Sequence, residues 1–203
     1  MKRIAFGESV QGASHKRNET ECQDSMKKVE FEDGSVVLAV ADGHGSKACP
    51  FSKSGSGIAV NVFCKVMQEF YTGYKDDLEL LLTYLNREGD TKVAQAVDEE
   101  WKRRVLIAHT KNKRDVPLTP DGEKDKTEIY KEYGTTLVGL MITPIFLFAF
   151  QIGDGDITYV DDTGVEEVLA ADKILGTETH SLSKTDAWKK AITVVRRRTV
   201  DEK

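Results

Sequence analysis

The chain has 203 residues, enough for one domain with its own core, and 39% of them are hydrophobic. The net charge of -5 and the pI of about 5.5 argue against a general role in binding nucleic acids or other polyanions. No apolar stretch has the length of a signal peptide or of a membrane span. The three cysteines (Cys22, Cys49 and Cys64) lack metal-ligand spacing, so we expect reduced thiols in a cytoplasmic protein. From the charge and the apolar pattern we expect neither nucleic-acid nor membrane partners.

Strands are predicted for the first part of the chain. Residues 3–10 (RIAFGESV) form one candidate strand. Residues 27–42 are typical of two strands that are joined at Glu32-Asp33-Gly34, a hairpin turn signal. The second of these strands ends in Asp42-Gly43-His44-Gly45. A turn requires only one glycine, and it requires neither the aspartate nor the histidine.

Helices are predicted for the middle of the chain. Apolar residues recur every four positions from residue 58 to residue 70, and this spacing gives one wide apolar stripe on a helix. A shorter helix is predicted over 76–88 and a third over about 93–108. The stripe of the first helix consists of Ile58, Val62, Val66 and Phe70.

A loop and further strands are predicted for the rest of the chain. Residues 110–128 are polar and contain two prolines and a glycine, which favours a mobile loop. Strands are predicted over 132–142, 145–155, 156–164 and 191–199. The order of strands, helices and strands predicts a single α+β domain over residues 1–203, with layers built on mainly antiparallel sheets.

The residues after the second predicted strand suggest a metal site. A carboxylate at a strand end is held rigidly, and hard divalent cations such as Mg²⁺ and Mn²⁺ prefer oxygen ligands. Gly43 lets a backbone carbonyl approach the same cation, and His44 can donate a proton near neutral pH. The alternative interpretation is a glycine-rich turn with a surface histidine.

A second apolar strand also ends in an aspartate between two glycines, Gly153-Asp154-Gly155. Two such strand ends could bring Asp42 and Asp154 together into a two-metal site for phosphoryl chemistry. The alternative here is a tight hairpin turn.

A third segment, residues 12–25, supplies further polar groups. Asp24 precedes a predicted strand and could accept hydrogen bonds from metal-bound water. His15, Lys16 and Arg17 form a small cationic cluster that could meet a phosphate. The alternative is a solvated loop.

Taken in chain order, these segments resemble the PP2C-type metal-dependent serine/threonine protein phosphatases. The resemblance implies a β-sandwich of two mainly antiparallel sheets flanked by helices, with Mn²⁺ or Mg²⁺ as cofactor. It implies two metal ions that share an attacking water, and a third, weaker ion. The segments that carry it are GASHKRNETECQDS (12–25), VLAVADGHGSKA (37–48), YGTTLVGLMI (133–142) and FAFQIGDGDITYV (148–160), and residues 176–183 resemble a bacterial-type branch.

The resemblance also assigns roles to individual residues. Asp42 would bridge the two metal ions, and the carbonyl of Gly43 would bind one of them. His44 would be the general acid for the seryl or threonyl oxygen of the leaving group. Asp24 would hold metal-bound water, and Asp154 would belong to the third metal site. The substrate would be a phosphorylated protein, with a cognate kinase as a further partner.

The chain departs from the family pattern at three positions near these motifs. Gln23 stands where the family often has a glutamate, and Gly155 stands where serine is usual. Glu19 occupies the place of the phosphate-binding arginine, so Arg17 or His15 would have to take over that role.

The largest departure lies in the C-terminal part of the sequence. The family has two further metal aspartates late in the chain, and none of the aspartates after Asp154 ends an apolar strand in the required way. We therefore expect a domain that lacks its last part and has little phosphatase activity. The alternative function is a catalytically deficient, phosphatase-like binding or regulatory module.

Overall fold

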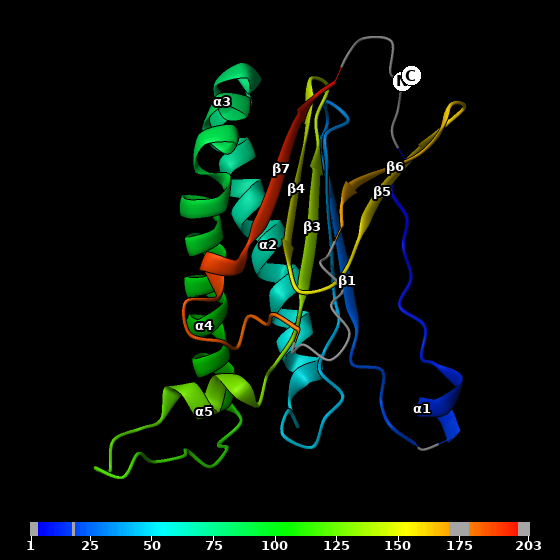
Figure 1. Ribbon diagram of the computed structural model, residues 1–203. Helices are drawn as coiled ribbons and strands as arrows, with labels where there is room; N and C mark the ends of the chain where they lie inside the picture. Colours follow the sequence, from blue (N-terminus) through cyan, green and yellow to red (C-terminus); the bar gives the residue numbers. More distant parts are fainter. Residues whose placement is uncertain (1–3, 18, 171–178, 199–203) are drawn as a thin grey trace.

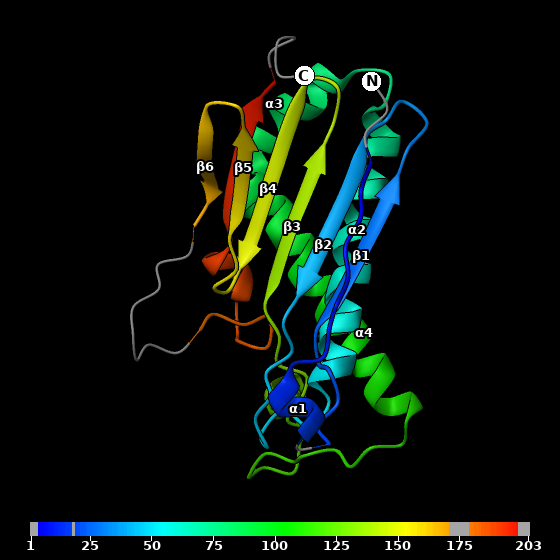
Figure 2. The ribbon, with the colours of Figure 1, turned by 90° about the vertical axis from the view of Figure 1, so that its right-hand side faces the viewer.

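The computed structural model describes residues 4–17, 19–170 and 179–198. Its main feature is a five-stranded antiparallel sheet with the strand order β1-β2-β3-β4-β7 (Figure 2). A separate antiparallel hairpin is formed by β5 and β6. The strands are β1 Ser25–Glu30, β2 Val36–Ala41, β3 Leu137–Ile142, β4 Phe146–Ile152, β5 Ile157–Asp161, β6 Gly164–Leu169 and β7 Ile192–Arg197. The predicted α+β class with two antiparallel sheets and flanking helices is confirmed.

The long helices α2, α3 and α4 cover one face of the five-stranded sheet (Figure 1). A single π-helical turn, η1, joins α3 to α4, so the second and third predicted helices follow one another without a loop. No helix of the described segments is long and apolar enough to cross a membrane. The helices are α1 Ala13–Arg17, α2 Ser52–Tyr74, α3 Leu78–Glu88, η1 Gly89–Val93, α4 Ala94–Lys111, α5 Lys126–Lys131 and the 3-10 turn η2 Ala187–Lys190.

The core lies between the sheet and these helices. Val37, Met141 and Phe148 are register partners on adjacent strands, and all three are fully buried. Gly139 lies under the ring of Phe63 from α2, and a Cβ at Gly139 would come within 2.2 Å of that ring. The alternation along the strands thus places one set of side chains against the helices, as the period of two requires.

The opposite face of the sheet is covered only in part. The β5–β6 hairpin and the N-terminal segment lie on this side (Figure 1, Figure 2). Val40 of β2 remains 52% exposed and Ile192 of β7 remains 45% exposed. The two faces of the sheet therefore differ strongly in burial.

The prediction of a strand over residues 3–10 is wrong for the residues that the structure describes, 4–10. The segment runs along the sheet without pairing to it, and Ile4 and Phe6 are 83% and 88% exposed. Its contacts are few: Ala5 is buried, and Lys28 donates a hydrogen bond to the Ala5 carbonyl at 2.7 Å. Alternating apolar residues favour a strand, but a strand also needs backbone pairing, and this segment pairs with none of the described strands.

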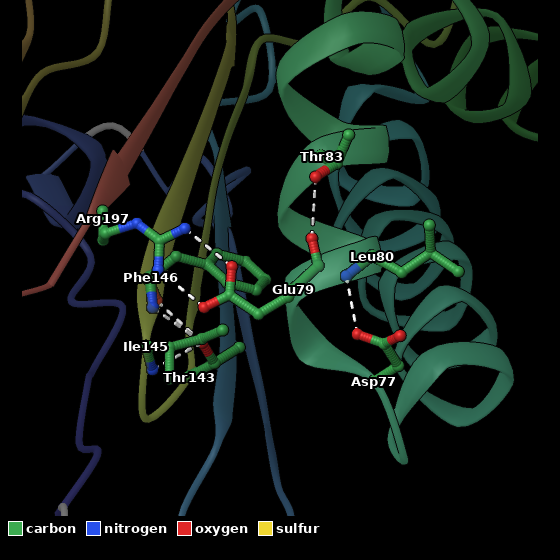
Figure 3. A network of polar contacts seen from close by, with 8 residues as sticks. All are labelled: Asp77, Glu79, Leu80, Thr83, Thr143, Ile145, Phe146 and Arg197. Carbon is green, nitrogen blue, oxygen red and sulfur yellow. Dashed lines mark hydrogen bonds and ion pairs between the residues drawn. The ribbon is translucent and has the colours of Figure 1, made fainter.

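The edge strand β7 is fastened to α3 by a bidentate ion pair. The guanidinium of Arg197 donates to both carboxylate oxygens of Glu79 at 2.6 and 2.7 Å (Figure 3). Asp77 caps the same helix by accepting from the Leu80 amide at 2.9 Å. The predicted last strand therefore exists and is held between β4 and the first turn of α3.

The loop predicted over residues 110–128 is shorter in the structure, because α4 extends to Lys111 and the short helix α5, which was not predicted, begins at Lys126. Asp125 caps this helix by accepting from the Glu128 amide at 3.1 Å. The helix leads into residues 133–136, which run beside the end of β2.

Candidate active site

The end of β2 is held by the two threonines that precede β3. The Asp42 amide donates to Thr136 Oγ1 at 3.1 Å, and the Thr136 amide donates to the Asp42 carbonyl at 2.9 Å. Thr135 Oγ1 donates to the same carbonyl at 2.9 Å. These bonds connect residues more than 90 positions apart and fix the backbone that carries the Asp42 carboxylate.

The glycines beside Asp42 are required by close backbone contacts. A Cβ at Gly43 would lie 2.6 Å from the Gln23 carbonyl oxygen and 2.9 Å from that of Ser52. The His44 amide donates to the Gly134 carbonyl at 3.0 Å, and a Cβ at Gly134 would lie 2.6 Å from the His44 ring. A side chain at Gly43 would push the backbone next to Asp42 out of place, and a side chain at Gly134 would displace the His44 ring.

Asp42 opens into a groove of about 510 Å³ that we call the acidic groove. Its carboxylates come from four separate segments, and no lysine, arginine or histidine is among the described residues that line it. The carboxylates are those of Glu8, Asp24, Asp42 and Asp154. The sequence motifs predicted the meeting of Asp24, Asp42 and Asp154, whereas Glu8 carried no signal because it lies in an irregular segment.

The carboxylates change the acidity of Asp42. Partial burial, the charge of Asp24, a hydrogen bond between the carboxyls of Asp42 and Asp24, and the charge of Asp154 together raise the pKa of Asp42 to about 6. The nearby charge of His15 acts in the opposite direction. Such a raised pKa is the expected result of like charges that share one site, and a bound cation would relieve the repulsion.

Asp154 is placed by the strained end of β4. Gly153 has a φ of +123°, which disfavours any residue with a side chain, and a Cβ at Gly155 would lie 2.4 Å from Val138. The Gln151 amide group donates to the carbonyls of both glycines. Asp154 Oδ2 accepts a hydrogen bond from Thr179 Oγ1 at 3.4 Å.

The donor set of the acidic groove fits a hydrated hard cation. Across residues 4–17, 19–170 and 179–198, no three histidine, cysteine or carboxylate side chains come close enough to hold a metal ion by themselves. Asp24 and Asp42 nevertheless face one another, and Mg²⁺ typically binds through one or two carboxylates while it keeps several waters. The backbone bridge between Gly43 and Thr135 is formed by two hydrogen bonds, from the Thr136 amide to the Asp42 carbonyl and from the His44 amide to the Gly134 carbonyl. The Gly43 carbonyl takes part in neither of these two bonds.

His44 lies outside the acidic groove. It lines a neighbouring groove of about 590 Å³, together with Lys131 and Lys184. We call this the basic groove; its remaining polar lining is mostly hydroxyl groups, which belong to Ser46, Thr179, Ser181 and Ser183. The sequence predicted the chemistry of His44 but not these surroundings.

The two candidates for phosphate binding are placed differently. His15 lies on α1, close enough for its charge to act on Asp42. Arg17 ends the same helix, is exposed, and lines neither groove.

A model of the protein phosphatase 2C family matches residues 11–202. Among solved structures, the chain is similar to arginine-to-alanine and arginine-to-lysine mutants of a bacterial serine phosphatase, with 12% and 11% sequence identity and TM-scores of 0.50 and 0.52. It is also similar to the serine/threonine phosphatase Stp1 from Staphylococcus aureus, with 10% identity and a TM-score of 0.50. Each match covers 87% of this chain and 64%, 68% and 66%, respectively, of the other chain. The chain therefore spans less than two thirds of the first and the third of these relatives. No curated protein matches the chain.

Proposed function

The chain belongs to the protein phosphatase 2C family, and from this premise we propose that it hydrolyses phosphoserine and phosphothreonine in proteins with the help of divalent cations. The observation that carries the proposal is the acidic groove, in which Asp24, Asp42 and Asp154 lie at or beside strand ends. A groove with this charge repels a phosphate dianion unless cations are present, so it suits metal-assisted chemistry and not binding of the bare anion.

The residues of the groove would hold Mn²⁺ or Mg²⁺. Asp42 is the central ligand of the proposed pair of ions, because its backbone is fixed by Thr135 and Thr136 and its carboxyl faces Asp24. Asp154 would contribute to a third, weaker site. When bound, these cations supply charge neutralisation of the phosphoryl oxygens and activation of water.

His44 would hold the proton for the leaving oxygen of serine or threonine. It is two residues from Asp42, and its backbone amide is anchored on Gly134. A seryl or threonyl oxygen leaves poorly without a proton, so an imidazole next to the cation site has a defined task. His15 is the better placed of the two phosphate-binding candidates, because its charge reaches Asp42, whereas Arg17 lines neither groove.

The proposed substrate is a phosphorylated protein, and a cognate kinase would be the source of the phosphate. The cytoplasm is the proposed compartment. It is supported by the cysteines Cys22, Cys49 and Cys64, which are all free thiols.

The test is turnover of a phosphothreonine peptide by the 203-residue chain with Mn²⁺, measured as released inorganic phosphate. Turnover that is abolished by a chelator and by Asp42→Asn supports the proposal. A chain that binds Mn²⁺ and folds but releases no phosphate from any phosphopeptide contradicts it, and would support the catalytically deficient binding module instead.

A further inference from the structure

We propose that the basic groove binds an anionic side chain of the substrate, one that neighbours the phosphorylated residue. The groove then selects phosphopeptides with a glutamate, an aspartate or a second phosphorylated residue beside the scissile phosphate. The identity of the ligand as a phosphopeptide rests on the proposed function, whereas the preference for an anion rests on the lining of the groove.

Lysines outnumber carboxylates among the described residues that line this region. The basic groove adjoins a second pocket of about 420 Å³ and shares Thr179, Ser181 and Lys184 with it. The two pockets together are lined by four lysines and, among the described residues, by only one carboxylate, on a chain with a net charge of -5. The lysines are Lys131, Lys184, Lys189 and Lys190, and the carboxylate is that of Asp186.

Lys131 and Lys189 take part in ion pairs on the surface. Lys131 is paired with Glu128, and Lys189 is paired with Asp186 at 2.7 Å. In each pair both side chains are about half exposed. Exposed pairs of this kind contribute little to stability, so an incoming anion can compete for the ammonium groups at low cost.

The floor of the basic groove is rigid and is connected to the acidic groove. Ser181 and Ser183 are 3% and 6% exposed, and their hydroxyls lie 2.9 Å apart. The Thr135 amide donates to Ser181 Oγ at 3.2 Å, and the Leu182 amide donates to the Thr135 carbonyl at 3.0 Å. Since Thr135 also binds the Asp42 carbonyl, one chain of hydrogen bonds connects the two grooves.

The grooves are close enough for one peptide to reach both. Thr179 lines the basic groove and donates a hydrogen bond to Asp154, which lines the acidic groove. A phosphoresidue at the cations would leave its sequence neighbours a few Å away, because successive Cα atoms are about 3.8 Å apart. An anionic neighbour is repelled by the carboxylates of the acidic groove and attracted by Lys131 and Lys184.

The test compares three fluorescently labelled phosphothreonine peptides that differ at one flanking position. This position carries glutamine, glutamate or the phosphonate analogue of phosphoserine, and the phosphothreonine is replaced by its non-hydrolysable phosphonate analogue. Binding is measured by fluorescence anisotropy in the presence of Mn²⁺, so that cations can hold the phosphonate in the acidic groove while no turnover occurs. We expect the glutamate peptide to bind about 3-fold more tightly than the glutamine peptide, and the phosphoserine peptide to bind more tightly still. The preference should weaken as salt is added.

The variants Lys131→Gln and Lys184→Gln should each remove much of this preference. Lys75→Gln is the matched control, because Lys75 is exposed and lines neither groove. Lys75 follows the C-terminal end of α2, whose 23 residues extend about 34 Å from the site. A gain for phosphoserine alone would define the ligand as a phosphate, and a gain for both would include carboxylates; each supports the inference.

Equal affinity for the three peptides would overturn the inference, as would a Lys184→Gln variant that behaves like Lys75→Gln in every arm. Failure of the proposed catalytic function is recognised separately. A chain that discriminates between the peptides but releases no phosphate with Mn²⁺ would retain the basic groove as an anion site and reject hydrolysis.

Discussion

Asp42 and His44 line two grooves whose described lining residues differ in charge, with Asp42 in the acidic groove and His44 in the basic groove. The acidic groove gathers four carboxylates without a lysine or arginine among its described lining residues, whereas the basic groove has Lys131 and Lys184 beside the imidazole. The difference separates two tasks that one surface cannot perform together. Cations bind where negative charge is concentrated, whereas an anionic peptide binds where the repulsion by these carboxylates is weaker.

The largest effect is expected at the centre of the acidic groove. Asp42→Asn removes the carboxylate that faces Asp24, so Mn²⁺ affinity should fall by about 100-fold or more, and turnover should be lost. Calorimetric titration of Mn²⁺ into both proteins measures this.

Two controls sharpen the first prediction. Asp162→Asn removes the same charge from an exposed turn, and Lys184→Gln changes the basic groove; neither should alter Mn²⁺ affinity by more than about 2-fold. Equal affinity of wild type and Asp42→Asn would remove Asp42 from the metal site.

The next effect concerns His44 and depends on the leaving group. His44→Ala should lower kcat for a phosphothreonine peptide by about 100-fold, because the threonyl oxygen needs a proton. The same variant should change kcat for an activated aryl phosphate only slightly, because that oxygen leaves without one. Steady-state kinetics on both substrates measure the difference, and equal losses would contradict the role of His44 as general acid.

The acidic groove should respond to pH in a defined direction. The pKa of Asp42 is raised to about 6, so Asp42 is mostly ionised at pH 7 and mostly protonated at pH 5. Protons compete with the cation for this carboxylate, and Mn²⁺ affinity should therefore fall by about 10-fold from pH 7 to pH 5. Calorimetric titrations of Mn²⁺ at several pH values test this. Asp42→Asn serves as the control, because its amide does not ionise in this pH range. An affinity that is constant over this window would show that Asp42 does not bind the ion.

The smallest effect is expected where the two grooves are connected. Ser181→Ala deprives the buried Thr135 amide of its acceptor, which should lower the free energy of unfolding by about 1–2 kcal/mol. Mn²⁺ affinity should fall by about 3-fold, because Thr135 then holds Asp42 less firmly. Urea unfolding and calorimetry measure the two effects, with Ser46→Ala at an exposed position as control. Unchanged stability and affinity would show that the grooves are independent.

The regular elements followed from local patterns, whereas the failures arose where pairing with another strand decides the outcome. The stripe of Ile58, Val62, Val66 and Phe70 predicted α2 because helix periodicity is a property of adjacent turns. The strand expected over residues 3–10 was wrong for the described residues 4–10, because they pair with none of the described strands. The strand β6, Gly164–Leu169, was not predicted, because its glutamates conceal the pattern and only pairing with β5 defines it.

The candidate side chains for the proposed chemistry could be named from the sequence alone. Asp42, His44 and Asp154 were identifiable because an apolar strand that ends in a glycine-flanked polar residue is visible in a few consecutive letters. Their spatial relations were not, since residues that lie near each other in sequence can face different grooves.

The neighbours of these side chains depend on the packing of distant segments. Asp42 shares a groove with Glu8 and Asp24, and His44 lines a groove with Lys131 and Lys184. These neighbours come from segments that are separated by tens of residues, and their meeting depends on sheet order, strand register and the backbone bonds of Thr135. Charge acts through space and not along the chain, so the opposite signs of the two grooves became visible only once the segments were packed together.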